Sequence, residues 1–219
     1  MHYADNYYVS DSSPSLVADS HTESFLIDGS NAVLAAVCDG VGDHLKGKAG
    51  AAEAIEGIRR KWHSLTEAEK LIPSTQLVLQ LAESGRENLS YNHQTTLALA
   101  VIRNHEYSAL NIGDSPVFLV SERRSQELSR RDNLYYYKRE NGFHAEPKDK
   151  SIPRYHLGNG HPDLYHCTTG RLFSGESLLL CTDGFDLAIP PDPAECFQVI
   201  CNTRNTGDNA TAVLLTLID

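Results

Sequence analysis

The order of periodic patterns along the chain is the feature that most constrains its fold. Two segments with helical spacing of apolar residues, near residues 49–62 and 73–82, interrupt a chain whose other apolar runs are of strand length. Runs of strand length precede this helical block and follow it as far as residue 217. We see no internal repeat and no linker, so the sequence predicts one domain of mixed strands and helices over residues 1–219.

Before the helical block, the sequence predicts a loop followed by a hairpin. The first twenty residues or so are polar and are expected to form a loop. Two β-type runs follow, Ser24–Ile27 and Val33–Cys38, and the turn signal at residues 28–31 joins them. The second helix is expected to begin near Pro73, with Ser74 and Thr75 as capping residues.

After the helical block, the character of the sequence returns to strands. The expected elements are three runs spaced as an antiparallel meander (Thr95–Val101, Tyr107–Ile112 and Val117–Val120), two later strands (Leu178–Cys181 and Thr211–Leu217) and a short helix at Ala194–Cys201. Residues 132–166 have little periodicity, and a loop of that length in a compact domain is usually functional or mobile. Within this segment, the Tyr135–Tyr137 cluster is interpreted as packing at a strand edge, with a substrate platform as the alternative.

Composition excludes several classes of function. The formal net charge is −10, and an acidic chain without a basic stripe argues against nucleic-acid binding. No apolar run approaches the roughly 18–20 residues that span a bilayer, and the amino terminus lacks the features of a signal peptide. The five cysteines form no C-x-x-C pair, so neither a disulfide framework nor a zinc knuckle is indicated. A cytoplasmic protein with no membrane or nucleic-acid partner is therefore expected, and we expect a monomer.

Four aspartates share one local pattern. Asp39 and Asp183 each end a β-type run and precede glycine, Asp114 ends another run, and Asp208 precedes the last one. Carboxylates on rigid strand ends are suited to hard cations such as Mg²⁺ and Mn²⁺, which prefer oxygen ligands. Two such ions can orient a phosphoryl group and lower the pKa of a water between them. The alternative interpretation is that each Asp-Gly pair is simply a turn.

Five segments together resemble the protein phosphatase 2C family. In chain order they are Ala36–His44 followed by Gly47–Gly50 (family V-A-D-G-M-G-G-H and G-x-x-A-S), Gln94–Ala98 (G-[ST]-T-A), Leu110–Ser115 (V-G-D-S-R), Leu179–Gly184 (L-L-x-[ST]-D-G) and Asp208–Thr211 (D-N-x-T). Each motif alone is weak, but five in order over residues 20–217 are specific. The resemblance implies an α+β, four-layer α-β-β-α sandwich with two central antiparallel sheets, in which residues 132–166 take the place of the family's flap.

The resemblance also implies the roles of individual residues. Asp39 would bridge two Mn²⁺ or Mg²⁺ ions, the carbonyl of Gly40 would bind one of them, and Asp183 and Asp208 would hold the other. Asp114 matches a position that helps to hold a third, weaker ion in bacterial members. Asp132 corresponds loosely to the aspartate of the family's L-T-x-D-H-S segment.

The first motif of the family is poorly kept, at residues 18–25. Glu23 stands where an acidic residue contacts a metal through water, but the arginine that grips the substrate phosphate aligns with Ala18. A bidentate guanidinium–phosphate pair is a strong contact, so its loss should weaken phosphate binding. The candidates to replace this arginine are Arg60, Lys46, Lys48 and Arg154. Pro116 stands where the family has arginine after Gly-Asp-Ser.

Two histidines fall near the expected site. His21 occupies the asparagine position of the first motif, and a structural role is favoured over one as general acid. His44 matches the histidine of the family's first aspartate motif and is expected in the turn into the first helix.

The resemblance implies hydrolysis of phosphoserine or phosphothreonine in a protein, with an autophosphorylated Ser/Thr kinase or the substrate of that kinase as the partner. Two alternatives remain open. A pseudophosphatase would keep the fold to bind a partner or phosphoprotein without turnover, which the altered first motif favours and the retained aspartates oppose. A second alternative keeps the enzyme but assigns it a small phosphoester as substrate.

Overall fold

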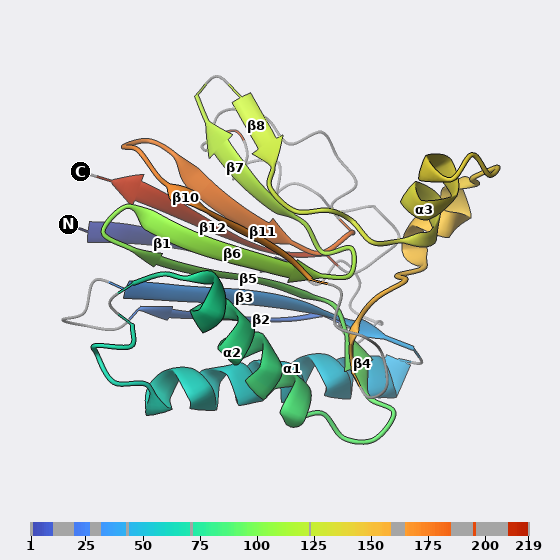
Figure 1. Ribbon diagram of the computed structural model, residues 1–219, viewed down its shortest axis with the longest axis horizontal. Coiled ribbons are helices and arrows are strands. Elements are labelled where there is room, and N and C mark those ends of the chain that lie inside the picture. Colours follow the sequence, from blue (N-terminus) through green and yellow to red (C-terminus); the bar gives the residue numbers. More distant parts are fainter. Residues whose placement is uncertain are drawn as a thin grey trace.

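Two antiparallel β-sheets stack face to face, and two long helices cover the outer face of one of them (Figure 1). The structure is a computed structural model that describes residues 2–10, 20–26, 32–42, 44–70, 72–122, 124–158, 165–184, 195 and 210–218. No helix in these ranges has the length and apolar character needed to span a bilayer. The fold is α+β, as the sequence predicts.

The larger sheet has seven strands within the described residues. Its hydrogen-bonded order is β10-β6-β5-β3-β4-β9, and β2 pairs with β3 beside this path. The strands are β2 (Ser20–Leu26), β3 (Ala32–Val41), β4 (Gln94–Thr95), β5 (Leu97–Arg103), β6 (Glu106–Ile112), β9 (Leu157–Gly158) and β10 (His166–Arg171). The predicted hairpin before the helices is confirmed as the antiparallel β2–β3 pair, and its turn lies outside the described residues.

The smaller sheet has five strands within the same ranges, in the order β1-β12-β11-β7-β8. They are β1 (His2–Ser10), β7 (Val117–Ser121), β8 (Arg124–Glu127), β11 (Ser177–Cys181) and β12 (Ala210–Ile218). Two expectations were wrong here. Residues 2–10 of the polar amino terminus form a strand, because they pair along their whole length with β12 and include the strand-forming residues Tyr7, Tyr8 and Val9. The expected meander also breaks, because β7 leaves β6 and joins the other sheet.

Helices α1 (His44–Ser64) and α2 (Thr75–Glu87) pack on the larger sheet (Figure 1). The Oγ of Ser74 accepts a hydrogen bond of 3.2 Å from the Leu77 amide, which confirms the predicted cap of α2. The helix expected at Ala194–Cys201 lies outside the described residues, apart from Glu195, which is helical.

The apolar run at the start of β3 supplies both layers of the core. Leu34, Ala36 and Cys38 face the helices and join a cluster that includes Trp62. The alternate residues, among them Val37, face the smaller sheet and pack between the two sheets. A strand buried on both faces needs a continuous apolar run, which is what the sequence has here. Burial therefore fixes the register of β3 and with it the position of the residues at its end.

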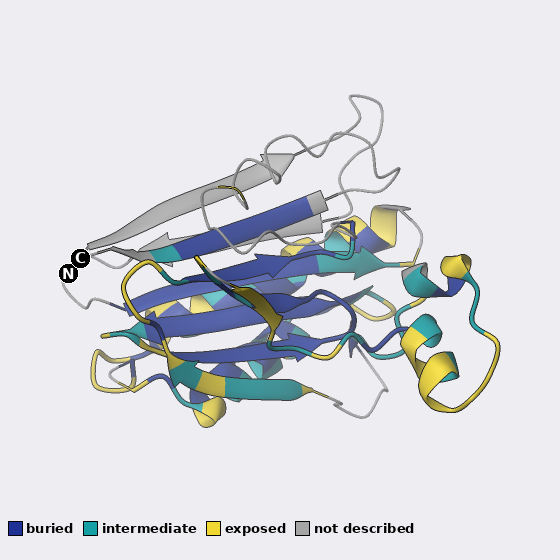
Figure 2. Ribbon diagram, turned by 90° about the horizontal axis from the view of Figure 1, so that it is seen from above, coloured by how far each residue is buried: buried dark blue, intermediate teal, exposed yellow. Residues whose placement is uncertain are grey.

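Residues 132–156, between the loop after β8 and strand β9, form short elements that include helices α3 (Leu134–Glu140) and η1 (Pro147–Ser151, a 3₁₀ helix). We call this segment the flap. Helix α3 lies beyond the sheets, at the end opposite to the two chain termini (Figure 1), and is more exposed than the strands (Figure 2). The interpretation of Tyr135–Tyr137 as packing at a strand edge was wrong, because these residues lie in α3 and none of them is buried.

Candidate functional site

The carboxyl ends of β3 and β6 lie at one edge of the larger sheet. Both strands run antiparallel to β5, so they run in the same direction and end on the same side. The chain leaves β6 through Gly113 and Asp114 and enters β7 of the other sheet. Asp39 near the end of β3 and Asp114 after β6 are therefore brought to the same end of the molecule.

The smaller sheet brings Asp183 to this end as well. β11 is antiparallel to β7, so it ends where β7 begins, and the Cys181 amide donates to the Pro116 carbonyl at 3.1 Å. The Thr182 amide donates to the Thr211 carbonyl at 3.0 Å, and the Thr211 amide donates to the Thr182 hydroxyl at 3.1 Å. The end of β11 and the start of β12 are thus held together. Asp208, which precedes β12 in the sequence, lies outside the described residues.

Thr96 joins two of the aspartate-bearing segments. Its backbone amide donates to the Asp39 carbonyl at 2.8 Å, and its hydroxyl accepts from the Asp39 amide at 3.2 Å. The same hydroxyl lies 2.6 Å from the Ser115 hydroxyl. Thr96 and Ser115 are both buried, so these bonds hold the end of β3 against the loop after β6.

Two glycines allow the backbone to approach closely at this end. A Cβ atom on Gly40 would lie 2.0 Å from the carbonyl oxygen of Gly47 in the first turns of α1. Gly113 has a φ of +89°, and a Cβ atom there would lie 2.9 Å from the Tyr155 carbonyl oxygen. Glycine is needed at both positions for these reasons. The Asp-Gly pair at residues 39–40 is therefore more than a turn signal, because it sets the contact between β3 and α1.

Asp114 is a buried acid whose pKa is strongly perturbed. Its side chain is 3% exposed, and Oδ2 has no hydrogen-bond partner among the described residues. Burial and, after it, the nearby Asp183 carboxylate raise the pKa of Asp114 to about 8. Asp183 is only half-buried, and the nearby Arg131 lowers the pKa of Asp114 in part. Two neighbouring carboxylates repel each other, and a cation between or beside them reduces that repulsion. The acid oxygens at this end therefore fit a hard divalent cation.

The structure brings only part of the predicted ligand set together. Asp39, Gly40, Asp114 and Asp183 lie at one end, but within the described ranges no three His, Cys, Asp or Glu side chains are placed to hold one ion. Glu23 lies in β2 and pairs through its backbone with Ala36 of β3. The side chain of Glu23 is not among those described. The assignment of individual metal ligands stays a prediction.

The residues that could replace the missing phosphate-binding arginine lie at different distances from the candidate site. Ala18 itself lies outside the described residues. Lys46 and Lys48 are exposed in the first turns of α1, near the site end. Arg60 is sixteen residues along the same helix from its start, about 24 Å away, and hydrogen-bonds to Asn88. Arg60 is therefore the wrong candidate.

The two histidines near the expected site are described through their backbones. His44 is the first residue of α1, which confirms its expected place at the entry to that helix. His21 pairs with Cys38 in the β2–β3 ladder. Neither side chain is among those described, so the structural role favoured for His21 over acid catalysis stays a prediction.

Asp132 ties the flap to the site, a connection that the sequence indicated only loosely. Its backbone amide donates to the Gly113 carbonyl at 3.0 Å, and its buried carboxylate lies 2.8 Å from Nε2 of His166. His166 lies in β10, a strand that the sequence did not predict, so no signal in the sequence pointed to this pair. Thr96 and Ser115 were likewise missed as links, although both lie within the motifs quoted above.

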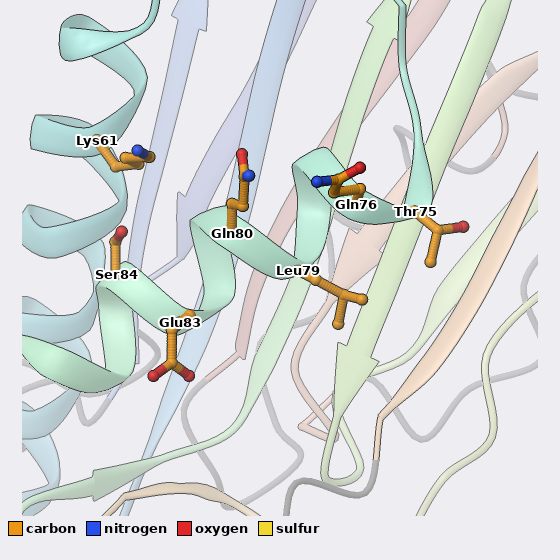
Figure 3. A pocket seen from close by; sticks show the side chains of 7 residues that line it. All are labelled: Lys61, Thr75, Gln76, Leu79, Gln80, Glu83 and Ser84. Atoms are coloured by element: carbon orange, nitrogen blue, oxygen red, sulfur yellow. The ribbon is translucent and has the colours of Figure 1, made fainter. Parts of the chain in front are cut away.

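A concavity of about 700 Å³ lies between α1 and α2 and is lined by polar side chains that include Lys61, Gln80, Glu83 and Ser84 (Figure 3). Its one carboxylate, on Glu83, forms an ion pair with Arg86 of the same helix. A single engaged carboxylate provides no set of metal ligands. We therefore do not assign the active site to this concavity.

Several solved structures share the fold. The serine/threonine phosphatase PstP/Ppp of Mycobacterium tuberculosis matches with a TM-score of 0.74 and 18% identity, over 100% of this chain and 99% of that one. The catalytic domain of PstP in complex with two manganese ions matches with a TM-score of 0.72 and 18% identity, over 100% and 98%. The serine/threonine phosphatase Stp1 of Staphylococcus aureus matches with a TM-score of 0.78 and 15% identity, over 100% and 96%. At these identities the likeness establishes the fold, including the two central antiparallel sheets that the sequence predicts.

No curated protein sequence gives a significant match. A family model described as protein phosphatase 2C matches residues 14–216, which is nearly the whole chain. The match includes the segments that carry Asp39, Asp114, Asp183 and Asp208. The chain therefore belongs to the protein phosphatase 2C family.

Proposed function

We propose that this protein is a metal-dependent phosphatase that hydrolyses phosphoserine or phosphothreonine in a protein substrate. The observation that carries the proposal is the buried Oδ2 of Asp114, which has no hydrogen-bond partner among the described residues, beside the charge of Asp183 and at the same end as Asp39. Repulsion between these carboxylates favours a bound cation at this end of the molecule. Membership of the family supports the same conclusion.

In the proposed mechanism, Asp39, the Gly40 carbonyl, Asp183 and Asp208 would hold two Mn²⁺ or Mg²⁺ ions, and Asp114 would help to hold a third. When bound, these ions supply the positive charge that activates a water and neutralises the phosphoryl oxygens. The protein supplies rigid placement, because the Thr96 bonds fix the end of β3 and Thr182 fixes the end of β11. Glu23 would orient a water at the site, and no side-chain nucleophile is required.

Membership of the family supports a phosphoprotein as the substrate, and the proposed partner is a Ser/Thr kinase or a substrate of that kinase. The flap is joined to Gly113 by the Asp132 amide, and in this proposal it would contact residues on either side of the phosphorylated one. We propose that one phosphatase domain, acting as a monomer in the cytoplasm, carries this activity.

The test is hydrolysis of para-nitrophenyl phosphate and of a phosphothreonine peptide, each with Mn²⁺, with Mg²⁺ and with a chelator. We expect turnover of both substrates only with a metal, and loss of at least 100-fold in kcat for Asp183→Asn, since a ligand to the activating charge is removed. The proposal would be refuted if a folded sample showed no metal-dependent turnover and any residual turnover were the same in Asp183→Asn. Turnover of the small ester but of no phosphopeptide would assign a small phosphoester as substrate.

The pseudophosphatase reading is the second candidate, and the absence of arginine at position 18 favours it. It predicts binding of a phosphopeptide without release of phosphate. A folded sample that binds the peptide, measured by fluorescence anisotropy, and releases no phosphate with either metal would support it over the enzyme.

A further inference from the structure

Arg154 in the flap is held against aromatic rings rather than by a carboxylate. Its guanidinium carbon lies 3.7 Å from the centre of the Tyr137 ring and 5.1 Å from that of Tyr155. No ion pair joins Arg154 to any residue in the described part of the chain. A guanidinium that stacks through its face keeps the N–H groups of its edge free to bind in the plane.

Three other cations in or beside the flap are engaged by carboxylates, whereas Arg139 also lies over a ring, that of Tyr135. Lys138 binds the buried Asp149 at 2.8 Å, and Lys148 lies 2.7 Å from Glu146. Arg130, just before the flap, pairs with Glu140. The Lys138–Asp149 pair joins α3 to η1, and in each of the three pairs the two charges neutralise each other. Arg154 thus differs from these three in having stacking contacts where they have ion pairs.

The backbone around Arg154 lies against the candidate site. The Arg154 amide donates to the Asp132 carbonyl at 2.7 Å, and the Asp132 amide donates to the Gly113 carbonyl at 3.0 Å. The carbonyl oxygen of Tyr155 lies so close to Gly113 that a Cβ atom at residue 113 would be 2.9 Å from it. Arg154 is therefore two backbone hydrogen bonds from the residue that precedes Asp114.

The strand that follows Arg154 also reaches the site. In β9, Leu157 pairs with Thr95 of β4, and Thr95 pairs with Gly40 of β3. The segment between Asp132 and β9 is thereby anchored on both sides, at the loop after β6 and at the end of β3. A side chain carried by such a segment has a defined position relative to Asp39 and Asp114.

We propose that Arg154 binds an anionic oxygen group of the phosphorylated substrate and so replaces the arginine that is absent at position 18. This inference rests on the proposed function. A guanidinium forms bidentate bonds with phosphate and with carboxylate, so the bound group is either the phosphate itself or an acidic side chain next to it. The chain carries a net charge of −10, and an anionic substrate needs such a cation at the entrance to the site. Tyr137 orients the guanidinium.

The test compares Arg154→Gln with Arg139→Gln. Arg139 also lies in the flap, 5.9 Å from the Tyr135 ring centre, and is exposed on α3, so both variants remove one positive charge from the same segment. KM and kcat are measured with Mn²⁺ on three substrates: para-nitrophenyl phosphate, a phosphothreonine peptide flanked by glutamates, and the same peptide flanked by alanines. We expect Arg154→Gln to raise KM at least about tenfold, with kcat within about twofold, and Arg139→Gln to leave both constants unchanged.

The substrate pattern identifies the bound group. A rise in KM for all three substrates assigns Arg154 to the phosphate, and a rise for the glutamate-flanked peptide alone assigns it to an acidic neighbour. An unchanged KM for every substrate overturns the proposal. Equal effects of Arg154→Gln and Arg139→Gln also overturn it, since they would mean that only the net charge of the flap matters.

The role of the stacking contact is tested with Tyr137→Phe and Tyr137→Ala. The phenylalanine keeps the ring under the guanidinium and is expected to preserve KM, whereas alanine is expected to raise it by about threefold to tenfold. Equal KM values for the two variants would refute the role of Tyr137 in positioning.

A separate measurement keeps this inference distinct from the proposed function. Binding of a fluorescein-labelled phosphothreonine peptide is followed by anisotropy in the presence of chelator, where no metal-dependent turnover occurs. The enzyme proposal fails if the wild type binds the peptide but shows no turnover with metal. The Arg154 proposal still stands in that case if Arg154→Gln weakens peptide binding about tenfold and Arg139→Gln does not. Equal binding by all three proteins overturns the Arg154 proposal whatever the result for turnover.

Discussion

Replacing Gly40 with alanine tests the contact that positions the first aspartate motif. The new methyl carbon would lie 2.0 Å from the Gly47 carbonyl oxygen and 2.1 Å from its carbon. Uncharged atoms come to rest at about 3.5 Å, so β3 and α1 would have to separate by about 1.5 Å. Both partners are backbone, and no side-chain rotation can relieve the overlap. We expect a loss of about 3 kcal/mol in the free energy of unfolding, at the upper end of overpacking costs.

A loss of that size lowers the melting temperature by about 6 to 12 °C in a chain of this length, which thermal unfolding followed by circular dichroism measures. Because the Gly40 carbonyl is a proposed metal ligand, isothermal titration of the folded variant with Mn²⁺ should also show at least about tenfold weaker binding. Val41→Ala is the matched control, since it trims the next residue of β3 without inserting an atom. A Gly40→Ala protein that melts within 2 °C of wild type and binds Mn²⁺ equally well would refute the packing argument.

Three further outcomes follow from single contacts. Ser115→Ala removes the partner of the buried Thr96 hydroxyl and is expected to cost about 1 to 2 kcal/mol in urea unfolding, and an unchanged midpoint would mean that the hydroxyl pair holds nothing together. Ser74→Ala deletes the cap of α2, so we expect a melting temperature lower by about 2 to 4 °C with the same kcat, and a change in kcat would place α2 in the catalytic machinery instead. Burial raises the pKa of Cys38 to about 12, so the Cys38 thiol should resist iodoacetamide at pH 8 in the folded protein and react only in denaturant. Peptide mass mapping measures this labelling. Rapid labelling of the folded protein would contradict the burial of Cys38 between β3 and α1.

The sequence predicted most of the fold where burial dictates the pattern. The apolar run of β3 and the helical spacing that ends near Trp62 are forced by the core, so their types could be read directly. β1 was missed because its polar residues were given more weight than the strand propensity of its three tyrosines and Val9, and its nine-residue pairing with β12 makes it a strand. After residues 113–116 the chain enters the second sheet, where β7 pairs with β11 instead of β6. The spacing of the apolar runs in the sequence cannot reveal which sheet a strand joins.

The sequence predicted the aspartates of the candidate site but not the residues whose hydrogen bonds hold the segments of the site together. Asp39, Asp114 and Asp183 were found because each lies within two residues of the end of a strand, a local feature that also brings them to one end of the molecule. The hydroxyl of Thr96 and the ring of His166 act across long sequence separations. Thr96 lies in a quoted motif, but its partners are not apparent from the sequence, and nothing in the sequence marks His166. Arg60 and Arg154 could not be ranked from the sequence, because their distances from the site depend on the length of α1 and on the path of the flap.

The rate of phosphate release from a phosphothreonine peptide as Mn²⁺ is added to metal-free protein tests the central claim most directly. We expect no release without metal, a rise that saturates with Mn²⁺, and at least a 100-fold lower plateau for Asp39→Asn, whose circular dichroism spectrum matches wild type. Release that is independent of Mn²⁺, or an Asp39→Asn protein as active as wild type, would contradict the account.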